Sequence, residues 1–345
     1  MASDASTIEC RLADPEDLAA WDSARAESRQ RCFANAGALL RSLHRNLTPL
    51  RVIECWQGGR IVGGCFGWAR GDGGLRRFQT PVTIGHGSLW VRDASLAPSP
   101  AQSLARDVTQ SLVPHLARDF DVIDFFVDPR FPDIRGFSQA GWTVSPYQTY
   151  QMALADADSH WRGLERNLRN HVSSAKKKGL TAEPSDDVAA LETVLSDMAQ
   201  RRGLPPVNIR PHLDEVYREF RSAGHGQLFV ARRPTGEIGA AALILWEGRE
   251  AGVYMSAVSG EHGRDGANPL VHWAAIEWLA QRGAFDMLDL YGTEPEEVGR
   301  FKKQFNAPLA WGWQVHRTAN PGMQLRRSLR ETWFNLKQTV RGRHG

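Results

Sequence analysis

The sequence predicts an α/β protein in which one unit of strands and helices occurs twice in tandem. The length of 345 residues suits two domains of ordinary size. Hydrophobic residues make up 42% of the chain and charged residues 23%, so each half has enough apolar side chains for a core. The segments FDVIDFF (120–126) and FDMLDLY (285–291) share Phe-Asp, two hydrophobic residues, Asp and an apolar pair, which indicates a duplication.

The first half predicts a hairpin, a helix, a strand, a second helix and a closing strand. The hairpin has alternating apolar residues and glycines at its turn, and the first helix has the helical spacing of apolar residues. The second helix is expected to end at Gly141, and the closing strand is rich in aromatic residues. The expected ranges, in order, are 51–68, 101–120, 121–127, 131–142 and 142–154.

The second half repeats that order around a Pro-Thr-Gly hairpin turn, and its long helix is expected to stop at Gly283. The expected ranges are 227–246, 251–258, 268–283, 285–291, 296–305 and 309–317. Hairpin, strand, helix, strand, helix, strand is the order of the GNAT acyltransferase fold. We therefore expect two tandem GNAT-like domains, 1–152 and 153–318, and a basic amphipathic helix at 319–345. The alternative is two unrelated α/β domains with coincidentally similar strands.

Composition and cysteine spacing limit the class of protein further. The net charge of +3 is a mild bias that permits anionic ligands without requiring them. The four cysteines (Cys10, Cys32, Cys55 and Cys65) include no CxxC pair, so we expect no disulfide framework, no metal site and a reducing compartment. The N-terminus lacks a signal-peptide pattern, and the longest apolar stretch, 238–246, is far shorter than a membrane span of roughly 20 residues. These features predict a cytoplasmic protein.

Several segments, taken together and in order, resemble the Fem family of peptidoglycan bridge-forming aminoacyltransferases, which are relatives of the GNAT acetyltransferases. The similar segments are 132–154, WRGLERNLRNHVSSAKKKGL (161–180), QRRGL (200–204), GVYMSAVS (252–259), ANPLVHWAAIEWLAQRG (267–283), DLYG (289–292) and FKKQF (301–305). No extended heptad stretch interrupts the second half, so the resemblance is to the compact members without a helical arm. It implies that the C-terminal helix packs back on the first domain.

The resemblance also implies a reaction and its partners. The donor would be aminoacyl-tRNA, and the acceptor an amine of a peptidoglycan precursor, a peptide or a small metabolite, with no cofactor. One alternative enzyme is an acyl-CoA-dependent N-acetyltransferase. The segment SGEHGRDGAN (259–268) raises that alternative, because a Gly-rich loop before a helix can hold the CoA pyrophosphate. A third possibility is a degenerate binding or scaffolding protein.

Lys302 is the leading catalytic candidate, because aminolysis of an ester passes through an oxyanion that a sheltered cation stabilises. Phe301 and Phe305 lie on either side of it at helical spacing and are candidates for shielding the ammonium or stacking on a nucleobase. Alignment of the two Phe-Asp motifs with a one-residue gap, so that Phe137 matches Phe301, places Ser138 opposite Lys302, so we expect the second domain to be catalytic. The alternative is a surface lysine on an amphipathic helix.

Two further residues are candidates for catalysis. Tyr254 lies in an apolar strand and could carry a proton at the leaving oxygen or the acceptor amine; otherwise it is a core tyrosine. Asp289 ends a buried strand beside the helix of Lys302 and could orient that lysine or accept a proton. Its counterpart Asp124 in the first copy favours a structural role instead.

The remaining candidates concern binding. By resemblance, Arg201 would contact an anion of the substrate, and Asn268 belongs to the substrate-binding set unless it caps a helix that begins at Pro269. The predicted helix 161–178 carries Arg166, Arg169 and Lys176 opposite an apolar stripe, as tRNA phosphates would require, although a solvated charged face is the simpler alternative. The basic tail is expected to dock on the first domain or to contact the inner membrane face peripherally.

Overall fold

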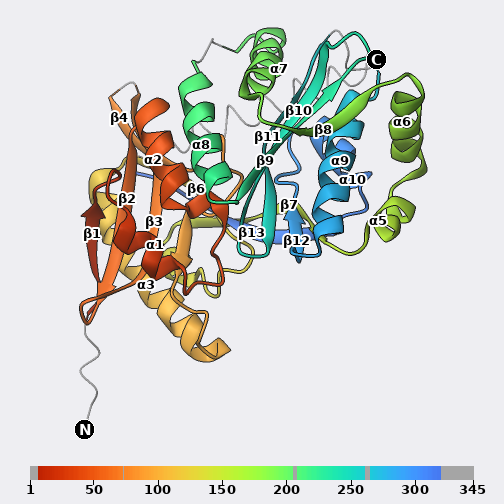
Figure 1. Ribbon diagram of the computed structural model, residues 1–345. Helices are drawn as coiled ribbons and strands as arrows, with labels where there is room; N and C mark the ends of the chain where they lie inside the picture. The colour runs from red at the N-terminus through yellow and green to blue at the C-terminus, as the bar shows by residue number, and fades with distance from the viewer. Residues whose placement is uncertain (1–6, 73, 205–207, 261–264, 320–345) are drawn as a thin grey trace, which may run out of the picture.

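A computed structural model describes residues 7–72, 74–204, 208–260 and 265–319 of the chain (Figure 1). The strands of both halves form one mixed sheet in the order β1-β2-β3-β4-β6-β13-β7-β12-β11-β10-β9-β8, with β5 beside β3. The strands of the first half are β1 (Glu9–Ala13), β2 (Leu50–Gln57), β3 (Arg60–Asp72), β4 (Leu75–Gln79), β5 (Leu89–Val91), β6 (Val122–Val127) and β7 (Thr143–Ala153). Those of the second half are β8 (Thr181–Ser185), β9 (Gly226–Arg232), β10 (Ile238–Glu247), β11 (Glu250–Val258), β12 (Met287–Asp289) and β13 (Leu309–Thr318).

The helices cover both faces of this sheet. They are α1 (Ala19–Arg25), the 3-10 turn η1 (Phe33–Asn35), α2 (Gly37–Asn46), α3 (Pro98–Asp119), α4 (Arg135–Gln139), α5 (Ala157–Gly163), α6 (Arg166–Lys177), α7 (Val188–Arg201), α8 (Arg210–Ser222), α9 (Ala267–Arg282) and α10 (Glu296–Lys303). Helices α3 and α4 enclose a core in the first half, while α5, α6, α9 and α10 enclose one in the second. A third core, under α1, α2, α7 and α8, is continuous across both halves.

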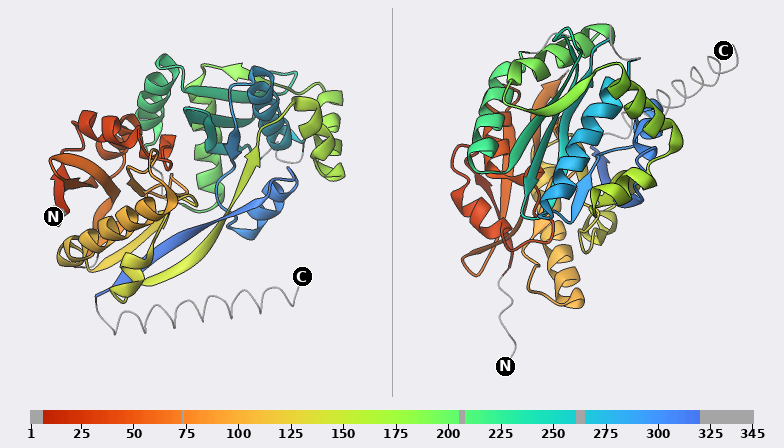
Figure 2. Two further views of the ribbon diagram at one scale, coloured as in Figure 1. Left: turned by 90° about the horizontal axis from the view of Figure 1, so that it is seen from below. Right: turned by 45° about the vertical axis from the view of Figure 1, so that its right-hand side comes forward.

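The two halves exchange their closing strands. The strand of each Phe-Asp motif pairs in parallel with an earlier strand of its own half, β6 with β4 and β12 with β11. On its other side each pairs antiparallel with the closing strand of the opposite half, β6 with β13 and β12 with β7. Strands β7 and β13 also pair with each other along most of their length, as the left view of Figure 2 shows. One continuous sheet therefore includes strands from both sides of residues 152 and 153, where the sequence predicts the boundary between the two domains. The domain boundary itself stays a prediction.

Most predicted elements are present, and the departures have local causes. Glycine in the left-handed conformation ends α9 at Gly283 (φ 59°), as predicted, because only glycine adopts that conformation without strain. The helix predicted within 131–142 is only the five-residue α4. The single helix predicted at 161–178 is wrong: extended backbone at Leu164 and Glu165 separates α5 from α6. The predicted apolar stripe is nevertheless buried from Leu164 to Ala175.

Two other sequence predictions bear on the ends of elements. The N-cap of α9 is Gly266, and Asn268 lies inside the helix, so the alternative of an Asn268 cap is wrong. Of the predicted C-terminal helix at 319–345, all but Ala319 lies outside the described residues.

All four cysteines are free thiols. Among the described residues, no helix is both long and apolar enough to cross a membrane.

A buried ion pair joins the halves and predicts a stability effect. The Arg25 guanidinium of α1 donates two hydrogen bonds to the Glu247 carboxylate of β10, at 2.5 and 3.0 Å, and both side chains are nearly inaccessible (4% and 9% exposed). Arg25→Met should lower the free energy of unfolding by about 3 kcal/mol, because it leaves a buried carboxylate with Arg31 as its remaining cation. Urea denaturation measures this change.

The matched control is Arg249→Met, because Arg249 makes the same two-bond contact with Asp286 at the surface (side chains 58% and 64% exposed). Solvent screens that pair, so its loss should change stability little. Equal effects of the two substitutions would contradict the assignment of Arg25 as an internal link between the halves.

Candidate active site

A cavity of about 370 Å³ lies where the two halves meet. The first half lines it with Phe33 and the loop 82–85, which lies between β4 and β5. The second half lines it with residues of α7, β11, α9 and α10 and of the turn after β12. The polar side chains in its wall include Thr83, Arg202, Tyr254, Ser256, Asn268, Glu294 and Lys302. Apolar walls with a few convergent polar groups are typical of a small-molecule or cofactor site.

Lys302 reaches this cavity from α10, and two backbone carbonyls hold its ammonium group. Its Nζ donates to the carbonyl oxygens of Tyr291 and Gly292, the latter at 3.4 Å. An ammonium group has three N–H bonds, so one remains for a ligand. Burial lowers the pKa of Lys302 to about 8, against the opposing attraction of the Asp289 carboxylate. The side chain is thus a partly desolvated cation in the wall of a cavity, which is the arrangement that an oxyanion requires.

Asp289 is buried behind that wall and does not itself line the cavity. Its Oδ1 accepts hydrogen bonds from the Tyr291 amide at 2.7 Å and from the Thr149 hydroxyl at 2.8 Å. Its Oδ2 accepts from His86 at 2.8 Å and from Gln151 at 2.9 Å. Burial alone would raise the pKa of Asp289, but the His86 charge and these hydrogen bonds lower it below its ordinary value. The carboxylate fixes the turn that holds Lys302, and the small void that it lines is separate from the cavity, so it is not placed to take a substrate proton.

Tyr254 lies in β11 with its ring in the cavity wall, and its hydroxyl is 2.5 Å from His212 Nε2 of α8. On the other side of that imidazole, Nδ1 lies 2.9 Å from the Ser42 hydroxyl of α2. The Ser42 hydroxyl can donate to the His212 carbonyl oxygen at 3.4 Å, and its oxygen accepts from Asn46 Nδ2 at 3.2 Å. In the tautomer with the proton on Nδ1, His212 donates to Ser42 and its Nε2 accepts the Tyr254 proton.

This hydrogen-bond chain decides what Tyr254 can offer a ligand. Burial lowers the pKa of His212 to about 4, so the imidazole is neutral at physiological pH. Burial also raises the pKa of the Tyr254 hydroxyl well above its ordinary value. In the tautomer with Nδ1–H, the Tyr254 proton points to His212, and the Tyr254 oxygen is an acceptor for an N–H or O–H donor in the cavity.

The two phenylalanines beside Lys302 differ in position. Phe301 lines the cavity, whereas Phe305 is almost fully buried (2% exposed) in the second-half core. Their rings meet edge to face at 5.2 Å, and His272 of α9 packs on Phe301 at the same centroid distance. Phe301 is therefore in position to touch a ligand, while Phe305 supports Phe301 from behind.

The structure brings Arg202 to the cavity in place of Arg201. Arg201 donates to the Val258 carbonyl at 2.6 Å and pairs with Asp197 at 3.3 Å, which holds β11 to α7. Arg202 lines the cavity and pairs with Glu297 of α10 at 3.3 Å. Asn268, predicted as substrate-binding, also lines the cavity.

The predicted phosphate-binding residues lie on α6, outside the cavity wall. Arg166 and Lys176 are exposed. Arg169 donates to the carbonyls of Arg162 and Leu164 at 2.7 and 2.6 Å, which satisfies the C-terminal end of α5. Arg166 and Lys176 thus remain available for an anion, and Arg169 has a structural task.

The sequence also raised a Gly-rich CoA-binding segment at 259–268 and predicted no metal site. Residues 261–264 of the Gly-rich segment 259–268 lie outside the described residues. Within the described part of the chain, no group of three or more His, Cys, Asp and Glu side chains could hold a metal ion.

Sequence reasoning missed the two histidines beside the site. His86 and His212 lie far from Lys302 in sequence, and each is a lone histidine without a metal or triad pattern. Only the Gly-His-Gly sequence at 85–87 is a local signal, because it predicts close backbone approach. A Cβ on Gly85 would lie 2.3 Å from the Tyr291 ring, so this loop packs directly on the turn that holds Lys302.

Comparison with known proteins agrees with this architecture. Residues 162–303 match the family of GNAT acetyltransferase domains. FemX is similar in structure, at 14% sequence identity over 92% of this chain and 99% of that one, with a TM-score of 0.56. A tandem GNAT protein from the clavulanic acid biosynthesis pathway is 15% identical over 91% and 99%, with a TM-score of 0.53. L-PGS from Bacillus licheniformis is 13% identical over 92% and 95%, with a TM-score of 0.58. No curated protein matches the sequence.

These matches define the class of fold: the chain has the fold of tandem GNAT proteins, and residues 162–303 of its second half match the GNAT acetyltransferase domain family. The resemblance to the Fem family is confirmed at the level of the fold, because the FemX structure matches 92% of this chain.

The site predicts an unusual titration for Lys302. Burial disfavours the charged form, so the ammonium should predominate at neutral pH and be lost as the pH rises through about 8, well below the ordinary lysine value of about 10.4. The chain has only six lysines (Lys176, Lys177, Lys178, Lys302, Lys303 and Lys337), so NMR of lysine labelled with ¹³C and ¹⁵N can follow each signal. Loss of one signal in Lys302→Arg assigns it. A Lys302 midpoint at the ordinary value would show an exposed side chain.

Proposed function

We propose that the protein is an N-acyltransferase that moves an aminoacyl group from aminoacyl-tRNA to an amine of a peptidoglycan precursor, a peptide or a small metabolite. The observation that carries the proposal is the Lys302 ammonium, held by two carbonyls in the wall of the cavity between the halves. The fold shared with FemX supports an aminoacyl donor, since the sequence resembles the Fem family, whose donor is aminoacyl-tRNA.

The residues of the cavity suit the steps of ester aminolysis. The acceptor amine attacks the ester carbonyl, and the carbonyl electron pair moves to oxygen, where the free N–H of Lys302 stabilises the negative charge. The Tyr254 oxygen accepts an N–H of the attacking amine and orients its lone pair toward the carbon. When the tetrahedral intermediate collapses, the ester C–O bond breaks. The ribose oxygen leaves with the proton that the amine gives up, so no additional base is needed.

The anion-binding groups have separate tasks in this proposal. Arg202 lines the cavity and suits a phosphate or carboxylate of the acceptor or of the donor terminus. Exposed Arg166 and Lys176 of α6 suit the tRNA backbone, for which sequence-independent cation contacts suffice. The protein would then work in the cytoplasm, with peripheral membrane contact where the acceptor is lipid-linked.

The second candidate is an acyl-CoA-dependent N-acetyltransferase. The family match to GNAT acetyltransferase domains and the similarity to a tandem GNAT protein whose structure is described as lacking AcCoA favour it. A thioester carbonyl forms the same oxyanion, so Lys302 would serve either donor.

Donor choice separates these candidates. The purified protein should transfer a radiolabelled amino acid from charged tRNA to an acceptor within a panel of peptidoglycan precursors, peptides and small amines, and RNase treatment of the donor should abolish transfer. The acetyl group of labelled acetyl-CoA should not be transferred at a comparable rate. Transfer from acetyl-CoA that RNase leaves unchanged would overturn the aminoacyl-tRNA proposal. No transfer from either donor to any acceptor would favour a binding protein.

The same assay tests the role of Lys302. Lys302→Met should lower turnover by about 10²- to 10³-fold, the usual effect of removing one oxyanion donor. The matched control is the neighbouring Lys303→Met, because Lys303 is exposed and does not line the cavity. Circular dichroism must show that both variants are folded. Near-normal turnover of Lys302→Met would contradict its catalytic role.

A further inference from the structure

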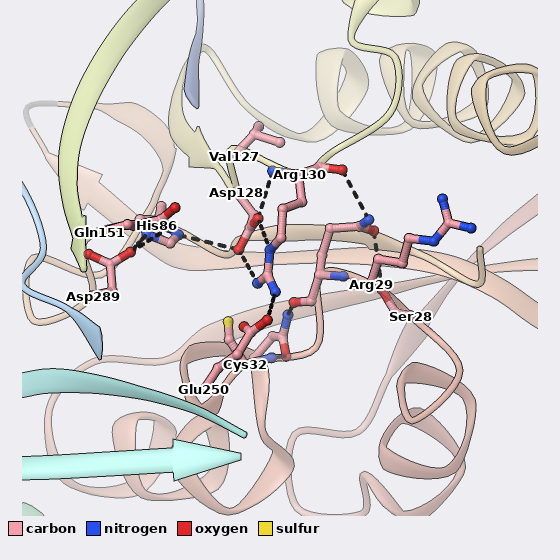
Figure 3. A network of polar contacts seen from close by, with 12 residues as sticks. Ser28, Arg29, Cys32, His86, Val127, Asp128, Arg130, Gln151, Glu250 and Asp289 are labelled. Carbon is pink, nitrogen blue, oxygen red and sulfur yellow. Dashed lines mark hydrogen bonds and ion pairs between the residues drawn. The ribbon is translucent and has the colours of Figure 1, made fainter. Parts of the chain in front are cut away.

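A lone histidine of the first half lies directly behind the turn that holds Lys302. His86 lies in the loop between β4 and β5 and is 2% exposed. Its Nε2 is 2.8 Å from Asp289 Oδ2, and its Nδ1 is 3.7 Å from Asp128 Oδ2, so the ring lies between two carboxylates (Figure 3). Only Nε2 makes a hydrogen bond, and the negative charges on both sides of the ring favour the imidazolium.

The surroundings of His86 contain charges from several elements. Asp128 follows β6 and makes a two-bond ion pair with Arg130 at 2.8 Å, and Arg130 also contacts Glu250 of β11. The rings of Tyr291 and Tyr147 lie 4.8 and 6.0 Å from the imidazole. Cys32 lines a small void together with His86, Asp128 and Asp289. Burial alone would lower the pKa of His86, but Asp289 and Asp128 together raise it above its ordinary value. The network thus pairs cations and carboxylates from both halves.

The Asp289 carboxylate connects His86 to the cavity through the turn formed by Tyr291 and Gly292. The Tyr291 amide donates to Asp289 itself, and the Gly292 amide donates at 3.1 Å to Thr149 Oγ1, which in turn donates to Asp289. Tyr291 and Gly292 both have the left-handed backbone conformation (φ 53°). The amides of this turn therefore face the anchored carboxylate, while its two carbonyls accept from Lys302. A shift of the carboxylate moves the acceptors of the ammonium.

We propose that His86 is a positioning residue for Lys302: its hydrogen bond holds the Asp289 carboxylate, which sets the Tyr291–Gly292 turn and so the place of the Lys302 ammonium in the cavity wall. Its effect on turnover depends on the proposed acyl transfer; its effect on Lys302 itself does not. The first half thereby takes part in the active site through a residue that never touches substrate.

Two amide substitutions of different reach test this inference. His86→Gln places an amide near the position of Nε2 and can keep the bond to Asp289. His86→Asn is one methylene shorter and reaches only toward the Nδ1 side. His115→Gln on α3 is the matched control, because it makes the same change at a histidine remote from the cavity. Circular dichroism and thermal melting check the fold of each.

The first measurement is the NMR titration of Lys302, which requires no substrate. The charged groups near its ammonium are Asp289 behind the turn and Arg202 and Glu294 in the cavity wall, while burial lowers the pKa of His272 to about 4. Once the turn is released, the ammonium should gain solvent, so His86→Asn should raise the midpoint by about one pH unit. His86→Gln should keep at least half of the wild-type depression, and His115→Gln all of it.

The second measurement is steady-state kinetics with the donor that supports transfer. His86→Asn should lower kcat about tenfold with KM values within about twofold, since misplacement of a catalytic group affects the transition state more than binding. His86→Gln should recover most of that loss. An unchanged Lys302 midpoint in His86→Asn would overturn the inference, as would equal loss in both variants. If His86→Asn does not fold, a His86→Gln titration at the ordinary lysine value overturns it. If the wild-type protein is inactive with every donor, the proposed function is wrong. The Lys302 titration then decides by itself whether His86 is a positioning residue.

Discussion

The hydrogen bonds to the Asp289 carboxylate are the constraint on which the rest of the site depends. A buried carboxylate is costly unless its acceptor sites are filled, and here four donors fill them. Three of those donors belong to the first half: His86 from a loop and Thr149 and Gln151 from β7. Only because β7 crosses to pair with β12 can its side chains reach Asp289. The exchanged strand thus explains why the turn that holds Lys302 depends on both halves, and why Lys302 lies where they meet.

Asp124 and Asp289 occupy equivalent positions in the two halves and share one structural role, and Asp289 has a second role at the site. Asp124 on β6 also accepts an amide from the exchanged strand, Gln314 Nε2 of β13 at 2.6 Å, with His316 nearby at 4.0 Å. In the first copy the residue opposite Lys302 is Ser138, whose hydroxyl donates to the Arg135 carbonyl within α4. A structural role for both repeated aspartates, Asp124 and Asp289, and an orienting role for Asp289 are therefore compatible. The carboxylate anchors an exchanged strand in both copies, and in the second it also sets the turn that holds a lysine.

Local sequence patterns predicted the parts of this molecule that depend on neighbouring residues. The hairpins, both Phe-Asp strands, the stop at Gly283 and a sheltered Lys302 follow from alternation, periodicity and glycine geometry. The exchange of β7 and β13 did not, because strand partners are chosen by tertiary packing and leave no local signal. The break between α5 and α6 was hidden by an apolar stripe that continues through it. Arg202 rather than Arg201 reaches the cavity because adjacent helical residues point about 100° apart, a difference finer than motif matching resolves. His86 and His212 act through partners distant in sequence, so only the folded chain identifies them.

In the proposed reaction, the turn anchored by Asp289 presents the Lys302 ammonium to the carbonyl of the acyl donor. A crystal structure with an unreactive aminoacyl-adenosine amide, which mimics the end of charged tRNA, would test it most directly. We expect the amide carbonyl oxygen about 3 Å from Lys302 Nζ in the cavity, with the Tyr291 and Gly292 carbonyls still accepting from the same nitrogen. A ligand carbonyl bound elsewhere, or a Lys302 side chain turned into solvent beside a bound ligand, would contradict it.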